Sequence, residues 1–416
     1  MRFSLLLAIL FVASSALPVQ FGNAEDWPQF LGTSRNGISE QKNLISSLDE
    51  PSFRVKWTAD VGVGMSAVSV SAGSAVTLSN DGTNQVIVCF NTDDGTLLWK
   101  TTIGESYENP MGNGPRATAA MTKAGVFAYT GDGRLVSVNR DSGQLNWVVD
   151  TIKAAGSKVS DYGMSSSPLI VGNKVIVHVG GRGSAVCAYH IESGKLIWKS
   201  GTGAAGYSSA LSLKANGLNQ VLSLTAAGLY ALNESNGDVL CHYPYKTPYD
   251  CNTASPMMCG EGIFISAGEN HGCAMLEINR MGNDFEFIER WTSNHTKSVM
   301  RNEWQTSIHF DDCIIGFDNV GSAGPVTHLT CVDTETGETK WQVPRFGKGN
   351  LTLADEKLWI TTMAGELILA RADSKGFQEL GRKPLFNKTR QSLSIANGHG
   401  YLRDNSKIYC LDLRKQ

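Results

Sequence analysis

Short apolar runs recur along the chain, and Gly, Asn, Asp or Ser residues bound each of them. The run KVIVHV covers residues 174–179, and the run KLWIT covers residues 357–361. Runs of this kind between turn residues predict β-strands. Small or apolar runs such as SPLI at 167–170 open the units, and we expect them to be the strands nearest a central channel. The pattern therefore predicts an all-β protein.

A longer stretch that ends in Gly-x-x-x-Trp is repeated along the chain, as in VCFNTDDGTLLW at residues 88–99. Each copy predicts two strands joined by a tight hairpin, because glycine supplies the positive φ that such a turn needs. The clear copies cover residues 88–99, 136–147, 187–198, 230–241 and 330–341, and weaker copies cover 276–291 and 370–381. The turn glycines of the clear copies are Gly95, Gly143, Gly194, Gly237 and Gly337.

The tryptophan that ends the repeat is large, and we expect it to pack between neighbouring sheets. The blade-ending positions are Trp57, Trp99, Trp147, Trp198, Cys241, Trp291, Trp341 and, in the weakest copy, about Gly381. The position six residues before the turn glycine is always small, and we expect it to face a crowded interior. Its occupants are Cys89, Ser137, Ala188, Ala231 and Cys331.

Successive blade ends lie between 40 and 51 residues apart, which suits the four strands of one β-propeller blade. The strand that ends at Trp57 has no hairpin partner before it, and the C-terminal run IYCLDL at 408–413 supplies one. We therefore predict a single closed propeller of eight blades over residues 51–416, closed by pairing of the N- and C-terminal strands. Seven blades is the alternative count. Residues 25–50 are predicted to form an extended arm.

Residues 1–24 have the features of a secretory signal peptide, with Arg2, an apolar run and small residues before the cut. The sequence therefore predicts a soluble protein of the periplasm or the extracellular space, with no transmembrane segment. It does not determine the oligomeric state, for which a monomer is the default expectation. Arg2 is the one charged residue in 1–24, so the mature chain has 35 basic and 39 acidic residues. This near-neutral balance argues against a nucleic-acid partner.

The repeat resembles the blade repeat of quinoprotein-type propellers, most clearly at Asp333 to Gly337 followed by Trp341. The segment WPQFLG at 27–32, followed by Asn36-Gly37, is similar to an N-terminal motif of exported bacterial proteins of this type. One branch of this family holds the pyrroloquinoline-quinone (PQQ) dehydrogenases. A non-catalytic branch includes the propeller lipoprotein of the outer-membrane β-barrel assembly machinery, whose lipid-bearing cysteine this chain lacks.

The dehydrogenase branch implies two adjacent cysteines against the quinone and acidic ligands for Ca²⁺. This sequence has no Cys-Cys pair and no Cys-x-x-Cys-His haem motif, and no motif assigns its acidic residues to a metal. We therefore expect no cofactor and no metal site, with PQQ and calcium as the alternative. A hydrolase or lyase is a third hypothesis, for which we find no pattern of nucleophile and base.

Three of the nine cysteines, Cys89, Cys331 and Cys410, occupy the small position of the repeat, where they should be buried and inert. Cys251 and Cys259 are close enough in sequence to form a disulfide, but spacing alone does not show the necessary geometry.

The loops that precede the innermost strands should gather at one end of the channel, and they carry aromatic residues beside Arg, Asp and Asn. Such a mixture suits a polar ligand, a sugar or a peptide segment. The alternative is that the mouth of a propeller is simply hydrated and polar. The candidate residues are Arg116, Asp161, Tyr162, Tyr207, Asp250, Asn252, Arg301, Glu303, Trp304, Lys348, Asn350 and Arg390.

The sequence as a whole favours a non-catalytic scaffold whose mouth or rim binds a protein or a glycan. The alternative is a PQQ-dependent dehydrogenase of alcohols or sugars with a non-standard site.

Overall fold

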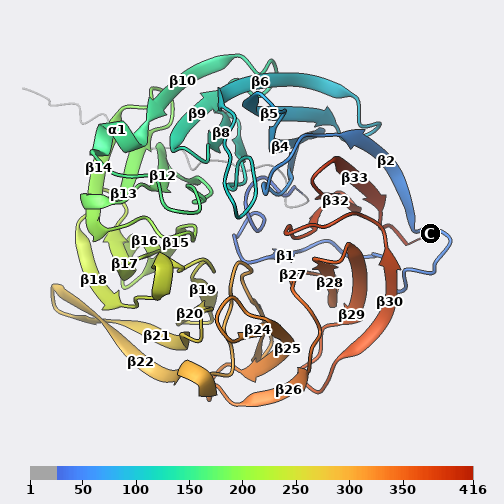
Figure 1. Cartoon of the computed structure of the whole chain (residues 1–416). Coiled ribbons are helices and arrows are strands. Elements are labelled where there is room, and N and C mark those ends of the chain that lie inside the picture. Colours follow the sequence, from blue (N-terminus) through green and yellow to red (C-terminus); the bar gives the residue numbers. More distant parts are fainter. Residues whose placement is uncertain (1–25, 416) are drawn as a thin grey trace, which may run out of the picture.

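The computed structural model describes residues 26–415, so the predicted signal peptide lies outside the described residues. Eight antiparallel sheets of four strands each are arranged around a central axis (Figure 1). One of these sheets has a fifth, very short strand, β1 (Ile38–Ser39), which pairs in parallel with its innermost strand. The prediction of an all-β propeller with eight blades, rather than seven, is confirmed.

In blades 1 to 4 the strands follow the chain from the centre of the ring to its rim. Blade 1 contains β3 (Ser69–Ser71), β4 (Ser74–Asn80), β5 (Asn84–Asn91) and β6 (Leu97–Glu105). Blade 2 contains β7 (Ala120–Thr122), β8 (Gly125–Tyr129), β9 (Arg134–Val138) and β10 (Leu145–Asp150). Blade 3 contains β11 (Leu169–Val171), β12 (Lys174–His178), β13 (Gly181–His190) and β14 (Leu196–Gly203). Blade 4 contains β15 (Leu211–Ala215), β16 (Leu218–Thr225), β17 (Gly228–Asn233) and β18 (Val239–Pro244).

Blades 5 to 8 complete the ring. Blade 5 contains β19 (Met257–Cys259), β20 (Gly262–Ala267), β21 (Gly272–Met281) and β22 (Asp284–Asn294). Blade 6 contains β23 (Ile308–Phe310), β24 (Cys313–Val320), β25 (Val326–Asp333) and β26 (Thr339–Val343). Blade 7 contains β27 (Gly349–Ala354), β28 (Lys357–Thr362), β29 (Glu366–Arg371) and β30 (Gln378–Pro384), with β1 (Ile38–Ser39) beside β27. Blade 8 contains β31 (Ser394–Ala396), β32 (His399–Arg403), β33 (Lys407–Asp412) and β2 (Arg54–Asp60).

Helical structure in residues 26–415 is confined to short turns between blades. These are α1 (Thr151–Ala155) and the 3-10 turns η1 (Pro248–Asp250) and η2 (His295–Lys297). No helix in this part of the chain is long and apolar enough to cross a membrane.

Blade 8 closes the ring, because its outermost strand comes from the N-terminal side of the chain. β2 pairs antiparallel with β33, and Trp57 lies opposite Cys410. The buried Arg403 guanidinium on β32 reaches into blade 1, where it donates to the backbone carbonyl of Leu78 at 2.6 Å. The closure therefore combines a sheet ladder with a charge-assisted contact between the last blade and the first.

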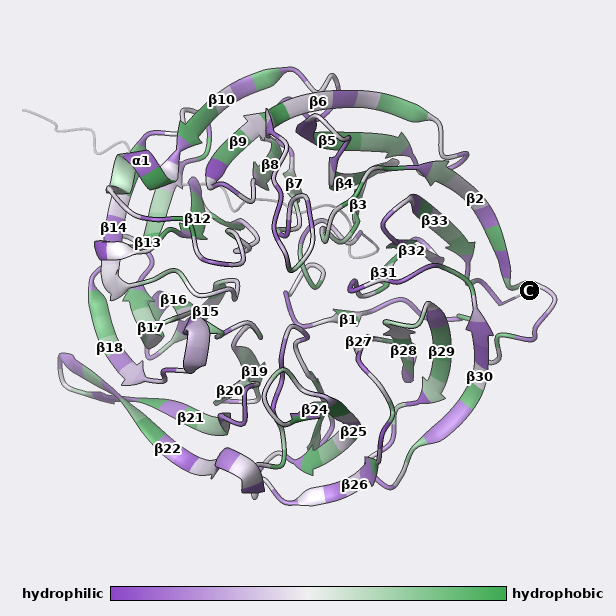
Figure 2. Cartoon of the chain, in the orientation of Figure 1, coloured by the Kyte–Doolittle hydropathy of each residue, from purple (hydrophilic) through white to green (hydrophobic). Residues whose placement is uncertain are grey.

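Hydrophobic residues gather on the middle strands of each blade (Figure 2). The strands β4 and β5 are buried along almost their whole length, whereas the outermost strand β6 alternates between buried and exposed residues. This is the expected pattern, because inner strands have a neighbouring blade on both faces and the outermost strand has solvent beside it.

In six of the eight blades, a tryptophan joins the blade to the hairpin turn of the next one. A Cβ atom built on Gly143 would lie 2.6 Å from the ring of Trp99, and a similar overlap occurs in four other blades. The indole N–H of each Trp also donates to a backbone carbonyl of the neighbouring turn at 2.9–3.1 Å. The Trp–Gly pairs are Trp57–Gly95, Trp99–Gly143, Trp147–Gly194, Trp198–Gly237 and Trp291–Gly337.

Two blade ends lack the tryptophan, and the contact between blades differs at each of them. Cys241 stands in blade 4, and the following hairpin β21–β22 is longer than the others, with nothing packed against its turn glycine, Gly282. In blade 7, Gly381 lies against Leu48, whose nearest atoms would be 3.1 Å from a Cβ at that position. The segment before β2 thus supplies the side chain that the weakest repeat lacks.

Residues 26–50, which we call the arm, cross the central channel from blade 1 to blade 7. Trp27 forms an antiparallel bridge with Val70 of blade 1. The buried Arg35 donates to the carbonyls of Ser167 and Pro168 in blade 3, each at 3.1 Å. β1 then pairs in parallel with the last residues of β27, and Figure 1 shows it leaving the centre of the ring towards the rim. The channel is therefore closed at the end where the inner strands finish.

Candidate binding cavity at the channel mouth

A cavity of about 760 Å³ occupies the other end of the channel, where the loops before the inner strands meet. Lys348 and Asn350, at the start of β27, lie in its wall, whereas the arm pairs with the end of the same strand. Phe30 and Leu31 of the arm also line the cavity. The arm therefore forms part of the floor of the cavity. Its volume lies within the range typical of small-molecule sites.

Hydroxyl groups at the start of successive inner strands form a girdle around the cavity. The Thr118 N–H donates to the Ser167 Oγ at 3.0 Å, and the Ser167 N–H donates to the Ser209 Oγ at 2.9 Å. The same contact links Ala67 to Thr118, Ser209 to Ser255 and Ser255 to Thr306. These bonds connect blades 1 to 6 side by side, and four of the hydroxyls line the cavity. The sequence signal is a Ser or Thr two residues before the inner strand in blades 2 to 6.

Two cations lie over the indole ring of Trp304 in the wall of the cavity. The Lys348 Nζ is 4.6 Å from a ring centroid, and the Arg390 guanidinium carbon is 5.2 Å from one. Lys348 also forms an ion pair with the Glu303 Oε2 at 2.6 Å and donates to the Ala323 carbonyl at 2.8 Å. Burial lowers the pKa of Arg390, with an opposing effect from the charge of Glu303.

The Glu303 side chain fits between two glycines and is only 9% exposed. A Cβ on Gly268 would lie 2.8 Å from the Glu303 Cγ, and a Cβ on Gly324 would overlap the Glu303 Oε1. Burial raises the pKa of Glu303, although the hydrogen bond from Lys348 opposes this shift. Within residues 26–415, both the Glu303 Oε1 and the Trp304 Nε1 are buried without a hydrogen-bond partner. Both atoms lie within the protein and out of contact with solvent, so neither is presented on the surface of the cavity.

The Arg116 guanidinium is hydrogen-bonded to the protein backbone. Its guanidinium donates to the carbonyls of Tyr162, Gly114 and Gly112, and it lies 4.6 Å from the ring centroid of Tyr107. Burial lowers its pKa to about 10, so the group remains charged at neutral pH. Arg116 therefore holds the mouth loops together and keeps few donors for a ligand.

Aromatic rings form the opposite wall. Tyr162 and Tyr207 lie with ring centroids 5.5 Å apart, and the Tyr207 hydroxyl accepts the Tyr162 N–H at 3.2 Å. Burial raises the pKa of Tyr207 above its ordinary value. Tyr249, in η1, also lines the cavity and is 66% exposed.

Cys251 also lines the cavity, and burial together with nearby acidic groups raises the pKa of its thiol to about 11. The thiol is therefore neutral at physiological pH.

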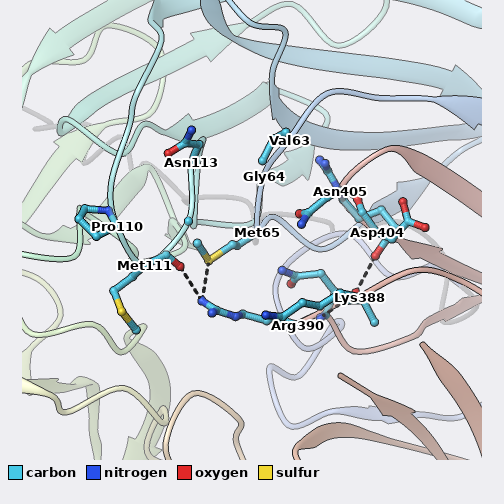
Figure 3. A pocket seen from close by; sticks show the side chains of 14 residues that line it. Val63, Gly64, Met65, Pro110, Met111, Asn113, Lys388, Arg390, Asp404 and Asn405 are labelled. Carbon is cyan, nitrogen blue, oxygen red and sulfur yellow. Dashed lines mark hydrogen bonds between the residues drawn. The ribbon is translucent and has the colours of Figure 1, made fainter. Parts of the chain in front are cut away.

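A smaller cavity of about 220 Å³ adjoins the first at the junction of blades 8 and 1. Arg390 lines both cavities, and Figure 3 shows its side chain pointing towards Met65 and the backbone of Met111. The Arg390 Nη1 donates to the Met111 carbonyl at 2.8 Å. This contact links the loop of the closing blade to the long loop after β6.

Eight of the predicted mouth residues line the main cavity: Arg116, Tyr162, Tyr207, Glu303, Trp304, Lys348, Asn350 and Arg390. The other four, Asp161, Asp250, Asn252 and Arg301, are not in its lining. Asn252 is buried and donates to the Thr225 and Tyr245 carbonyls. Arg301 is buried against Asp318. Phe30 and Leu31 of the arm and the hydroxyl girdle were not among the residues predicted from the sequence.

All nine cysteines lie within the described residues, and none of them forms a disulfide there. Cys251 is half-buried at the cavity, whereas Cys259 is buried in the core of blade 5, so the two do not form a disulfide in this structure. Cys89, Cys331 and Cys410 are buried, as predicted.

Comparison with known sequences finds relatives in both branches of the quinoprotein-like propellers. The quinohemoprotein alcohol dehydrogenase ADH-IIG of Pseudomonas putida is 32% identical over 126 residues, which are 27% of this chain and 16% of that protein. The outer membrane protein assembly factor BamB of Shewanella oneidensis is 24% identical over 204 residues, 48% of each protein. The matches thus span about half, or less, of the length of these relatives.

Solved structures show the same fold at low sequence identity. The quinohemoprotein alcohol dehydrogenase of Comamonas testosteroni aligns with a TM-score of 0.68 and 13% identity, covering 94% of this chain and 81% of that one. BamB from Moraxella catarrhalis aligns with a TM-score of 0.59 and 15% identity, covering 86% and 99%. The family model for the outer membrane protein assembly factor BamB matches residues 41–213 and 84–342, which together exceed half of the chain. The chain therefore belongs to the BamB-like family of PQQ-repeat β-propellers.

Proposed function

We propose that this protein is a non-catalytic scaffold outside the cytoplasm that holds a protein partner at the mouth of its propeller. Membership of a family named for an assembly factor supports a scaffold role. The observation that carries the proposal is the plugged channel, whose open end is surrounded by rigidly held loops with exposed apolar and aromatic side chains.

Met111 and Tyr249 are the most prominent of these side chains, at 45% and 66% exposed. Both belong to loops around the cavity, and Arg390 fixes the Met111 loop through its carbonyl. Met, Tyr and Arg are enriched in the buried centres of protein interfaces, and a preformed loop loses little entropy when a partner binds. A partner that covers the mouth would therefore bury residues suited to an interface.

The residues of the cavity do not fit PQQ with calcium. Among residues 26–415, no group of three or more His, Cys, Asp or Glu side chains is placed to hold a metal ion. Glu303 is paired with Lys348, and Glu269 accepts hydrogen bonds from Ser322 and Ala323. Arg116 is occupied by three backbone carbonyls, so it has little capacity for a carboxylate of the quinone.

Site-specific photocrosslinking tests the proposal. A photoreactive side chain at position 111 or 249 should capture the same protein in the native host, and one at Leu196, an exposed position on the outer strand β14, is the control. Capture only from the mouth positions supports the scaffold. Equal capture from position 196 contradicts a mouth site.

A second measurement tests the dehydrogenase alternative. The purified protein is unfolded thermally with and without PQQ and Ca²⁺, and dye reduction is followed with alcohols and sugars. A ligand that binds only the folded state raises the melting temperature. A rise that is accompanied by dye reduction would overturn the non-catalytic proposal.

A further inference from the structure

We infer that the cavity at the channel mouth binds a small apolar monocarboxylate. The Arg390 guanidinium holds its carboxylate, and the methionine, leucine and aromatic side chains of the lining contact its apolar body. This site is additional to the protein contact surface proposed above and does not depend on it.

The unused N–H groups of Arg390 are the first observation. The Arg390 Nη1 donates to the Met111 carbonyl at 2.8 Å, and within residues 26–415 neither its Nε nor its Nη2 has an acceptor. None of the buried, unpartnered polar atoms in this part of the chain belongs to Arg390. Its Nε and Nη2 are therefore in contact with solvent, unlike the Glu303 Oε1 and the Trp304 Nε1. Arg390 lines both cavities, so these donors are open to a ligand.

The ionic groups in the lining of the main cavity leave one positive charge in excess. The lining contains three cations, Arg116, Lys348 and Arg390, and two carboxylates, Glu269 and Glu303. Lys348 is paired with Glu303 at 2.6 Å, whereas Arg116 and Arg390 donate only to uncharged groups. Burial lowers the pKa of Arg390, which means that its charge is incompletely solvated. One negative charge on a ligand would compensate it.

A single carboxylate is the anion that best matches these donors. The Nε–H and one Nη2–H of a guanidinium lie in one plane and can form two parallel bonds with the two oxygens of a carboxylate. Such bonds between opposite charges are shorter and stronger than neutral ones, and a partly desolvated wall strengthens them further. A dianion would bring a second charge for which Lys348 is not free, because Glu303 already neutralises it.

The rest of the lining includes apolar surface for the body of the ligand. The Met65 Sδ lies 3.7 Å from the Arg390 Nη1, so a thioether adjoins the cation. Methionine side chains adapt to apolar groups of different shapes. The volume of about 760 Å³ is typical of a small-molecule site. The other aliphatic and phenyl side chains in the wall are Phe30, Leu31, Met111, Leu351 and Met363.

Isothermal titration calorimetry of the purified protein tests the inference. The probes are octanoate, 3-phenylpropionate and indole-3-acetate, and the neutral amide of each is its matched control. Acetate carries the charge without the apolar body. At least one of the three probes should bind saturably at millimolar concentration or below. Its amide and acetate should each bind about tenfold more weakly, or less tightly still.

Arg390→Gln removes the charge and keeps a hydrogen-bonding side chain of similar polarity. The dissociation constant of the carboxylate should rise about tenfold or more in this variant, whereas that of the amide should not change. The unchanged amide separates loss of the charge from distortion of the cavity. Arg390→Lys keeps the charge but loses the planar fork, and it should bind the carboxylate with intermediate affinity.

Arg280→Gln is the matched control, because it makes the same substitution on the exposed hairpin of blade 5. It should bind the carboxylate as the unmodified protein does. The melting temperature of each variant establishes that it is folded. If Arg390→Gln does not fold, a photoreactive diazirine analogue of octanoate decides with the unmodified protein. Its label should fall on peptides that contain Met65, Met111 or Met363, and excess octanoate should prevent the labelling.

Four outcomes would overturn the inference. None of the three carboxylates saturates; the amides bind as tightly as the carboxylates; Arg390→Gln binds the carboxylate as tightly as Arg280→Gln; or the photoreactive analogue labels peptides outside the cavity. Loss of partner crosslinking in Arg390→Gln without any binding of the small carboxylates would assign this cation to the protein interface instead. That result would leave the proposed scaffold function standing.

Discussion

The indole ring of Trp99 lies directly over Gly143 of the next blade, and its N–H donates to the backbone carbonyl of Arg140 at 3.1 Å. One tryptophan thus seals the space between two sheets and satisfies a polar group of the neighbouring turn. The same arrangement recurs around the ring, so each hairpin turn of the repeat is both a local structure and a contact surface for the preceding blade.

Replacing Gly143 by alanine should destabilise the propeller strongly. The residue has φ +70°, which costs about 1 kcal/mol or more for a residue with a Cβ, and the added carbon would overlap the Trp99 ring. We expect a loss of about 2–4 kcal/mol, measured as a shift of the denaturation midpoint. Gly217→Ala is the matched control, since Gly217 has φ +79° and no atom within 4 Å. Equal losses in the two variants would show that the contact with tryptophan is unimportant.

Removing one member of the buried ion pair between Arg301 and Asp318 should cost more than removing both. The two side chains are 4% and 2% exposed and are joined by two bonds of 2.6 Å. Arg301→Leu leaves an uncompensated buried carboxylate, for which we expect a loss of about 3–5 kcal/mol. The double variant with Asp318→Leu should be the more stable of the two in urea denaturation. A double variant that is less stable than Arg301→Leu would contradict this account.

Acid should weaken the closing blade through Asp404. Burial alone would raise the pKa of this carboxyl, but hydrogen bonds from three backbone N–H groups and the Tyr409 hydroxyl outweigh burial and hold it at about 2. An unfolded aspartate titrates near pH 4, so the charged form is stabilised by folding. This stabilisation, on the order of 2 kcal/mol, is complete above about pH 4 and is lost as the pH falls towards about 2.

Asp404→Asn should therefore lower stability at neutral pH and flatten the dependence of the unfolding free energy on pH between about 4 and 2. Thermal unfolding across this pH range is the measurement. Asp284→Asn, on the exposed hairpin, should leave the profile unchanged. A profile for Asp404→Asn that runs parallel to that of the unmodified protein would refute the role of this carboxylate.

The arm should contribute to stability mainly through Trp27. This side chain is 2% exposed and its backbone pairs with Val70 in both directions, at 2.9 and 2.8 Å. Trp27→Ala should cost about 3–5 kcal/mol, because a large buried ring leaves a cavity. Phe30→Ala, at the half-buried floor of the cavity, should cost less and should enlarge the cavity. Comparable losses in the two variants would show that the floor, rather than the anchor, stabilises the arm.

Local repetition explains why the architecture could be predicted. The turn glycines, the small residues six positions earlier and the terminal tryptophans recur at a blade-length period, and each motif forms its hairpin through contacts between residues close in sequence. All eight predicted blade ends lie on outermost strands, including Cys241 and Gly381, where the motif is weakest.

The loops of the mouth follow a different rule, because their side chains are oriented by residues far away in the chain. Arg301 and Glu303 are two positions apart, yet Asp318 draws one into the core, while Gly268 and Gly324 make room for the other beside the cavity. The sequence by itself determined the fold class, the number of blades and the end of the channel where polar loops gather. Only the tertiary structure decided which loop residues reach the cavity and that the arm closes it, since both depend on packing between segments that no local pattern connects.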